Sequence, residues 1–396
     1  MKDDIFSEIK PLHLRPGRDR RILQGHRWVF SNEIAEPLSD YEPGSWVQVY
    51  STKGVNLGCG YVNPASLISV RLVCPPGIKP GEPFFRDALA GAAALRRFLY
   101  PGSRCHRLVY GESDNLPGLV VDRYGDVLAY QVGTLGMARI EPLIRDLLAD
   151  LFAPSALVFR NDGALRAMEG LPQEKGVALG TLPADHVVEI DGTRYRVDTL
   201  KGQKTGMYLD QRDNRRELRG WAKGAKVLDL FCYNGAWSLA AAAAGAVETV
   251  GVDGSEEAVS QARENAALND AAGRCTFVSA DVFDFSKKVR PGQFDIIIAD
   301  PPAFAKNKSA LPEARKGYTD LNRRALLALR PGGLLVTCSC SYHLGEDIFR
   351  EVLLAAAQAS GRRLRLLQVR GQALDHPCLL AMPETRYLKC FFLQVM

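Results

Sequence analysis

One strand–turn–helix segment decides the fold of this chain, and it reads Lys226-Val227-Leu228-Asp229-Leu230-Phe231-Cys232-Tyr233-Asn234-Gly235-Ala236-Trp237-Ser238. The apolar residues at its start predict a buried strand. Gly235 allows the backbone to turn tightly beside a ligand, and a helix is expected to follow directly. A strand that passes through a glycine turn into a helix is typical of the ligand-binding edge of an open α/β sheet.

The sequence around this segment repeats the same alternation of strands and helices. Helical patterns at residues 255–268 and 320–329 separate the apolar runs, and residues 386–395 read as an antiparallel edge strand. Fully apolar strands that alternate with helices predict a parallel sheet covered on both faces. We therefore expect a doubly wound, Rossmann-like α/β domain, with strands at residues 226–230, 249–252, 275–278, 294–299 and 333–337.

Acidic residues close three successive predicted strands. Asp229 lies at the end of the first strand, Asp253 closes the second, and Asp281 follows the third. One such acid is often only a helix cap, but three in order indicate a nucleoside site, in which Asp253 accepts the ribose hydroxyls. The turn lacks the three glycines of pyrophosphate-binding loops. We expect S-adenosylmethionine, with Asp229 at its amino-acid part and Asp281 and the amide of Val282 at its adenine.

The fourth predicted strand ends in Asp300-Pro301-Pro302-Ala303-Phe304. Two prolines fix the backbone and remove donors, so the turn is rigid and its carbonyls are free. An Asp-Pro-Pro turn beside a methyl donor is typical of enzymes that methylate a planar, nitrogen-bearing group such as a nucleobase. We expect Asp300 and Pro301 at the cofactor and Phe304 to stack on the base.

The fifth predicted strand carries two cysteines toward the same edge, Cys338 and Cys340. A buried cysteine is usually only a small apolar residue, and that explains one of the two. Carbon 5 of a pyrimidine, however, needs a nucleophile at carbon 6 before it can accept a methyl group. A cysteine facing the base therefore predicts pyrimidine C5 methylation. Methylation of a purine nitrogen would need no such nucleophile.

The first half of the chain divides by composition. Short β-like runs up to residue 75 predict a small β-barrel, and a proline-rich linker at residues 74–81 follows. Residues 84–181 mix strands and helices, with helices expected at residues 86–100 and 140–152.

Basic residues gather in two places. The stretch from Lys10 to Arg27 holds six Lys or Arg against one acid, and the net charge of the whole chain is +5. A second cluster comprises Arg362, Arg363, Arg365 and Arg370. Clustered bases indicate a phosphate-bearing partner, although a solvated face explains them as well. Arg15, Arg20 and Arg21 are the candidate RNA contacts.

With these motifs in place, the sequence resembles the ribosomal RNA large-subunit methyltransferase I family over nearly its whole length. The resemblance rests on residues 14–18, 25–30, 114–122 and 202–212, on Asp229–Gly235, on Asp300–Phe304 and on Ser339-Cys340-Ser341. The sequence departs from the family at Met207-Tyr208, where two aromatics are usual, and at Cys232-Tyr233-Asn234. Unlike the larger group of 5-methylcytosine enzymes, it has no cysteine after Asp300-Pro301.

The resemblance implies a PUA domain at residues 1–75, a small α/β domain at 76–185 and a methyltransferase domain at 186–396. It also implies 5-methylcytosine formation in large-subunit ribosomal RNA, with Cys340 as the nucleophile and Cys338 as a structural neighbour. The candidate catalytic residues are Cys340 and Asp300. The candidate cofactor residues are Asp229, Phe231, Tyr233, Gly235, Asp253, Asp281, Val282, Asp300 and Pro301, and we expect no metal.

The composition argues against a secreted, membrane-spanning, disulfide-bonded or zinc-binding protein. The N-terminus does not resemble a signal peptide, no apolar run is long enough for a membrane span, and nine scattered cysteines without a CxxC pair argue against disulfides and zinc. We expect a cytoplasmic enzyme, and a homodimer is a possible assembly. Guanine or uracil methylation on the same fold, a small-molecule or lipid methyltransferase, and a non-catalytic RNA-binding or assembly factor stay open as alternatives.

Overall fold

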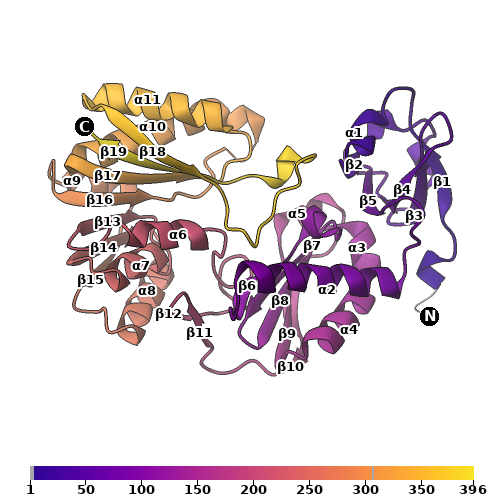
Figure 1. The fold of residues 1–396 in the computed structure, drawn as a ribbon, viewed down its shortest axis with the longest axis horizontal. Coiled ribbons are helices and arrows are strands. Elements are labelled where there is room, and N and C mark those ends of the chain that lie inside the picture. The colour runs from indigo at the N-terminus through magenta and orange to yellow at the C-terminus, as the bar shows by residue number, and fades with distance from the viewer. Residues whose placement is uncertain (1–3, 306) are drawn as a thin grey trace. The chain divides into compact units, whose positions relative to one another are not determined.

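The computed structural model describes residues 4–305 and 307–396, which form two compact units (Figure 1). The first unit runs to Val188 and also includes Val197–Leu209 and Leu374–Thr385. The second comprises Glu189–Arg196, Asp210–Ala373 and Arg386–Met396. Strands β11 (Val187–Ile190) and β12 (Thr193–Arg196) form a two-stranded sheet of their own. Within the described residues, no helix has both the length and the apolar character of a membrane span.

The first unit begins with a five-stranded sheet in the order β1-β3-β4-β5-β2. Gly60 lies where β4 crosses β5, and a Cβ there would approach the Arg71 carbonyl oxygen to 2.1 Å, so the close strand pairing requires glycine. The predicted small β domain is confirmed. Its elements are β1 (Lys10–His13), α1 (Arg20–Leu23), β2 (Trp28–Val29), β3 (Trp46–Tyr50), β4 (Asn56–Val62) and β5 (Val70–Cys74).

A second five-stranded sheet follows in the order β10-β9-β8-β7-β6, antiparallel except for the parallel pair β8 and β9. Helix α2 begins four residues before the predicted start at Arg86, because Pro83 is tolerated in a first helical turn. The elements are α2 (Glu82–Leu99), β6 (Cys105–Tyr110), β7 (Leu119–Tyr124), β8 (Val127–Val132), α3 (Leu135–Arg139), α4 (Glu141–Phe152), β9 (Ala156–Asn161), α5 (Ala164–Met168) and β10 (Glu174–Gly180).

The two sheets of the first unit share one hydrophobic core. Trp46 and Tyr61 of the N-terminal sheet are buried with Phe85 of α2 and Met137 of α3. The Tyr61 hydroxyl donates to the Pro117 carbonyl oxygen at 2.8 Å and lies 2.8 Å from the Thr134 hydroxyl. This shared packing fixes the N-terminal sheet against the central sheet.

The second unit is built on a seven-stranded sheet in the order β15-β14-β13-β16-β17-β19-β18. The strands β15, β14, β13, β16 and β17, which are neighbours in this order, are mutually parallel. This arrangement confirms the predicted doubly wound fold. The elements are α6 (Arg212–Arg219), β13 (Lys226–Leu230), α7 (Ala236–Ala243), β14 (Glu248–Asp253), α8 (Glu256–Leu268), β15 (Cys275–Ser279), α9 (Val282–Lys288), β16 (Phe294–Ala299), α10 (Leu311–Ala328), β17 (Leu329–Ser339), α11 (Glu346–Ser360), β18 (Leu364–Arg370) and β19 (Lys389–Val395).

The predicted position of the last strand was wrong in one respect. Strand β19 is antiparallel, as expected, but it pairs on both sides, with β17 and with β18. The edge is β18, which the sequence analysis interpreted only as part of a basic cluster. It contains Arg365 and Arg370, and none of its residues is fully buried, as suits a strand at the edge of a sheet.

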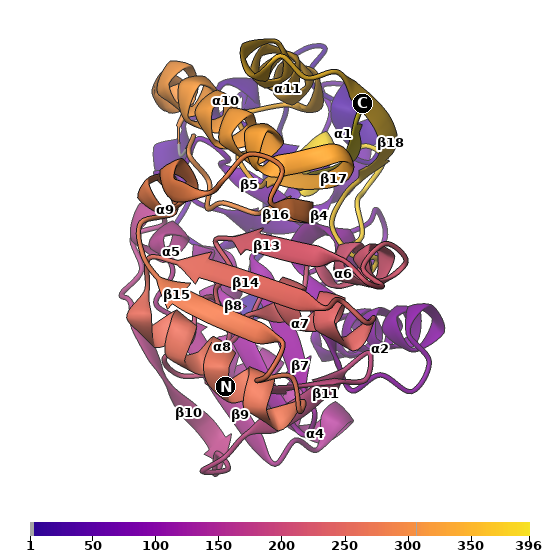
Figure 2. The same ribbon diagram turned by 90° about the vertical axis from the view of Figure 1, so that its left-hand side faces the viewer.

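Helices lie on both sides of this sheet (Figure 2), and the strand residues divide between two separate cores. Leu228, Ile297 and Leu335 pack with helices α10 and α11 on one face. Val227 and Ile296 pack with α6 and α7 on the other. The sheet is therefore buried on both sides, and its carboxyl edge is left to form a site.

Candidate active site

Parallel strands bring the predicted site residues of the second unit to one edge of the sheet. Asp229 and Asp253 lie at the ends of β13 and β14, Asp281 follows β15, Asp300 follows β16 and Cys340 follows β17. The spacing in sequence is large, but the register of the sheet makes these positions neighbours.

Asp229 is fully buried and only half satisfied. Its Oδ2 accepts hydrogen bonds from the Ser238 amide at 3.1 Å and the Ser238 hydroxyl at 2.8 Å. Its Oδ1 has no hydrogen-bond partner in the described part of the chain. Burial, and then the charges of Asp300 and Asp253, raise the pKa of Asp229 to about 7. A buried carboxylate with one vacant acceptor suits the ammonium group of an amino acid.

The turn after β13 is held in an unusual backbone conformation. Phe231 and Tyr233 have φ angles of 66° and 47°, and Gly235 has 79°. Non-glycine residues with positive φ are uncommon and gather at functional sites. At Gly235 a Cβ would come within 2.9 Å of the Phe277 ring. The glycine thus permits the turn and also lets it pack closely against β15.

Asp253 connects two strand-end turns. Its Oδ2 accepts from the Tyr233 amide at 2.9 Å and its Oδ1 from the Ser255 amide at 2.9 Å. Each carboxylate oxygen can accept a second hydrogen bond, so the group can still receive the hydroxyls of a ribose. The structure therefore gives Asp253 a positioning role that the sequence analysis did not predict.

Asp281 is exposed and caps helix α9, with its Oδ1 accepting from the Asp284 amide at 2.8 Å. Val282, which follows it, is buried in the core beneath α9 and α10. The capping role that the sequence left open for these acids is thus present at Asp281, and it leaves the other carboxylate oxygen at the sheet edge.

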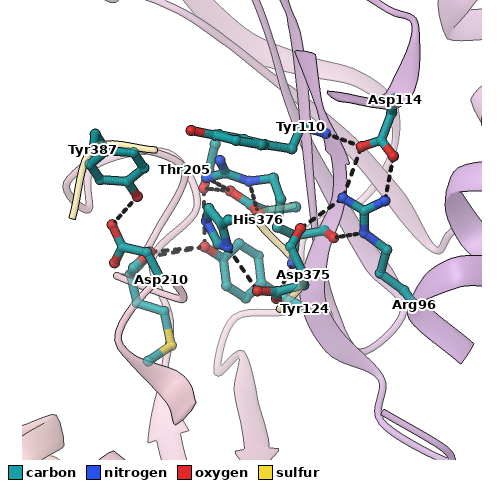
Figure 3. Close-up of polar contacts among 12 residues, drawn as sticks. Arg96, Tyr110, Asp114, Tyr124, Thr205, Asp210, Asp375, His376 and Tyr387 are labelled. Carbon is teal, nitrogen blue, oxygen red and sulfur yellow. Dashed lines mark hydrogen bonds and ion pairs between the residues drawn. The ribbon is translucent and has the colours of Figure 1, made fainter. Parts of the chain in front are cut away.

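Asp300 is oriented by two side chains that the sequence analysis missed. Gln211 Nε2 donates to its Oδ1 at 3.0 Å, and Trp237 Nε1 donates to its Oδ2 at 2.9 Å. Burial, followed by the charge of Asp210, raises the pKa of Asp300 to about 6. Asp210 itself accepts a hydrogen bond from the Tyr387 hydroxyl (Figure 3). Asp300 can therefore change protonation near neutral pH.

The Ser339-Cys340-Ser341 element is fixed by its two serines. The hydroxyls of Ser339 and Ser341 each lie 3.1 Å from the Tyr318 hydroxyl, and Ser341 Oγ also accepts from the Ala305 amide at 3.2 Å. Cys340 lies between them, with Sγ 4.0 Å from the Pro301 carbonyl oxygen. The two predicted chemical motifs, at the ends of β16 and β17, are thus brought together.

The two cysteines of β17 differ in environment. Cys338 is fully buried opposite Cys390 on β19, and burial raises its pKa well above the usual range. Cys340 is partly exposed. A thiol must be accessible to act as a nucleophile, and of these two cysteines only Cys340 is.

Lys389 is a further polar residue beneath Cys340 that the sequence analysis missed. It is 7% exposed, and its Nζ donates to the carbonyl oxygens of Ser341 at 2.7 Å and Tyr387 at 2.8 Å. Burial lowers its pKa to about 8, against an opposing effect of Cys340. A lysine directly before the apolar run Cys390–Leu393 was the available signal.

Phe304 lies within an aromatic cluster. Its ring centroid is 4.5 Å from that of Tyr318, and 6.4 Å and 6.3 Å from those of Phe231 and Phe283. The ring is only partly buried, so one part of it faces out of the cluster. Base stacking by Phe304 remains a prediction. The contact with Phe231 gives Phe304 a second role, which is to support the turn after β13.

The predicted RNA contacts lie in the first unit and differ in how they are held. Arg15 and Arg20 are exposed, and Arg15 Nε donates to the Ile34 carbonyl oxygen at 2.8 Å. Arg21 pairs with Glu33 at 2.8 Å and 2.9 Å and lies over the Phe30 ring. The charge of Arg21 is therefore largely compensated, which leaves Arg15 and Arg20 as the better candidates for phosphates.

Comparisons with known proteins agree with this geometry. The family described as S-adenosylmethionine-dependent methyltransferase matches residues 166–367, and a PUA-like domain matches residues 12–75. The chain is 36% identical to the ribosomal RNA large subunit methyltransferase I of Cronobacter sakazakii over 97% of this chain and 99% of that protein. It is 39% identical to the protein of the same name from Shewanella denitrificans, over 96% and 97%.

Solved structures share the fold. A SAM-dependent methyltransferase from Streptococcus mutans aligns with a TM-score of 0.83 at 22% identity, covering 98% of this chain and all of that one. A methyltransferase named SMU.776, complexed with SAH, aligns with a TM-score of 0.85 at 23% identity and the same coverage. The chain thus belongs to the ribosomal RNA large-subunit methyltransferase I family, and it combines an N-terminal PUA-like domain with a C-terminal S-adenosylmethionine-dependent methyltransferase domain.

Proposed function

We propose that this enzyme forms 5-methylcytosine in large-subunit ribosomal RNA, with Cys340 as the nucleophile. The observation that carries the proposal is the position of Cys340, partly exposed at the end of β17, with Sγ 4.0 Å from the carbonyl oxygen of Pro301 in the Asp-Pro-Pro turn. Ribosomal RNA as the substrate is supported by the names of the relatives, which match over nearly the full length. The cytoplasm is the corresponding location, and the homodimer stays a prediction.

The residues at the sheet edge fit S-adenosylmethionine. The vacant Oδ1 of Asp229 would accept from its ammonium group, Asp253 would accept from the ribose, and Asp281 with Val282 would meet the adenine. Phe231, Tyr233, Gly235 and Pro301 would line the same site. When bound, this cofactor supplies the methyl group to carbon 5 of the base.

The chain's own residues account for the remaining steps. The Cys340 thiolate adds to carbon 6, which moves an electron pair toward carbon 5. Asp300, with a pKa of about 6, would hold the amino group or ring nitrogen 3 and limit charge on the ring. After carbon 5 has been methylated, a base removes its proton, and the electron pair of that C–H bond restores the double bond and expels the thiolate from carbon 6. Lys389 would stabilise that thiolate by its charge.

The product of the reaction tests the proposal. Unmodified large-subunit ribosomal RNA would be incubated with methyl-labelled S-adenosylmethionine and digested to nucleosides. The label is expected in 5-methylcytidine. Label in 5-methyluridine would keep the cysteine chemistry but overturn the choice of base, and label in a methylguanosine would overturn both.

A further inference from the structure

A cavity of about 360 Å³ lies entirely within the first unit, where the N-terminal sheet meets the central sheet. Its volume falls within the roughly 300–1,000 Å³ that small-ligand sites occupy. It is separate from the candidate active site, because no residue of the seven-stranded sheet lines it.

The lining combines an aromatic ring with apolar walls. Trp28 is partly exposed, its Nε1 donates to Glu112 at 2.8 Å, and the Arg71 guanidinium lies 5.4 Å from its ring centroid. Leu119 and Leu165 contribute apolar surface, and Leu165 is 47% exposed. A fixed, accessible indole beside apolar walls suits a flat, π-bonded ligand.

Glu384, in one wall of the cavity, has a carboxylate in which one of the two oxygens lacks a donor. Glu384 Oε1 lies 3.5 Å from His26 Nε2, and its buried Oε2 has no hydrogen-bond partner within residues 4–305 and 307–396. A second carboxylate, Glu112, lines the same cavity. A buried acceptor without a donor is costly, so a ligand with N–H groups would stabilise it.

The segment that carries Glu384 is firmly anchored to the central sheet. Arg96 pairs with Asp114 at 2.6 Å and 2.8 Å and also donates to the Asp375 carbonyl oxygen at 2.7 Å (Figure 3). The Asp375 carboxylate accepts from the Arg107 amide at 2.8 Å, and the Tyr110 hydroxyl donates to the Thr385 carbonyl oxygen at 3.2 Å. The acceptor is therefore held in place in advance of binding.

We propose that this cavity binds an unpaired guanine base of the RNA substrate. Guanine carries two adjacent N–H donors on its Watson–Crick edge, and a carboxylate such as Glu384 matches that pair with two acceptor oxygens. The base would stack on Trp28, and the basic stretch that ends beside His26 would hold the flanking phosphates. The inference rests on RNA being the partner, but not on which base is methylated.

Binding of short oligonucleotides to the full chain tests the inference. Oligouridines with a single central G, A, C or U would be compared by fluorescence anisotropy at fixed salt, with GMP as competitor. The G-containing oligonucleotide is expected to bind about tenfold more tightly than the others, as a charged hydrogen bond allows. Glu384→Gln and the cavity-filling Leu165→Trp should each remove this preference.

Leu67→Trp is the matched control, because Leu67 is 79% exposed and does not line the cavity. It should keep the preference for G, and all three variants should bind S-adenosylmethionine as the wild type does. Equal binding of all four oligonucleotides, or a preference that survives in Leu165→Trp, would overturn the inference. If GMP alone binds as tightly as the G-containing oligonucleotide, the cavity serves a free nucleotide and the assignment to RNA is wrong.

Discussion

Replacing Asp229 with asparagine should stabilise the ligand-free protein at pH 8 and weaken its binding of S-adenosylmethionine. The carboxylate is fully buried, with one oxygen on Ser238 and the other without a partner in the described residues. In Asp229→Asn the side-chain oxygen can keep the Ser238 hydrogen bonds, and no charge has to be buried. The two effects have opposite signs, which separates a cofactor role from a purely structural one.

The magnitude follows from the pKa of Asp229, raised to about 7 by burial and by nearby carboxylates. Because the folded protein binds this proton more tightly than the unfolded chain does, stability falls as pH rises from about 4 to about 7. Between pH 5 and pH 8 the wild type should lose about 3 kcal/mol through this group, and the variant should not. The unsatisfied amide hydrogens of asparagine offset about 1–3 kcal/mol of the gain at every pH.

Urea unfolding of both proteins at pH 5 and pH 8, without cofactor, gives the difference directly. Calorimetry at pH 8 should show cofactor affinity reduced about ten- to a hundredfold in the variant. Asp295→Asn, at the opposite end of β16, should leave that affinity unchanged. Parallel stability curves for wild type and Asp229→Asn, together with unchanged affinity, would refute the reasoning.

Three further predictions follow from the site and the basic stretch. Asp253→Ala should weaken cofactor binding about ten- to a hundredfold by calorimetry; unchanged affinity in a folded variant would remove Asp253 from the site. Replacing Arg15, Arg20 and Arg21 together should flatten the slope of log RNA affinity against log salt and leave cofactor binding intact, whereas an unchanged slope would mean a merely solvated face. Lys389→Met should slow alkylation of Cys340 by iodoacetamide about tenfold at pH 7, below the pKa of about 8 at which Lys389 loses its charge; peptide mapping separates Cys340 from the exposed Cys378. Lys389→Arg should retain the fast rate, and equal rates in all three proteins would contradict a role for that charge.

The sequence predicted the elements whose signal is local. The strand of residues 226–230 and the acids at the strand ends could be assigned because apolar runs and strand–helix alternation determine a doubly wound sheet. The edge position of β18 could not, because its arginines resemble a surface cluster until the neighbouring strand is placed. Pairing order depends on contacts that are distant in sequence.

The residues that support Asp300 and the Ser-Cys-Ser element could not be predicted from the sequence either. Gln211 at the N-cap of α6 and Trp237 in α7 both reach Asp300, although both lie in stretches that the sequence analysis had singled out for other reasons. Lys389 meets the Ser341 carbonyl oxygen only because β19 pairs with β17. Such partners are recognised by geometry alone, since a hydrogen bond between distant residues leaves no pattern in spacing.

The most direct test of the central claim is covalent trapping on RNA that contains 5-fluorocytosine. Fluorine at carbon 5 cannot leave as a proton, so the adduct between Cys340 and carbon 6 should accumulate after methyl transfer and shift the protein on a denaturing gel. Cys340→Ala should lose both the adduct and methylation, whereas Cys338→Ala, which alters only a buried neighbour, should retain both at reduced stability. An active Cys340→Ala enzyme, or an adduct that peptide mapping assigns to Cys338, would contradict the account.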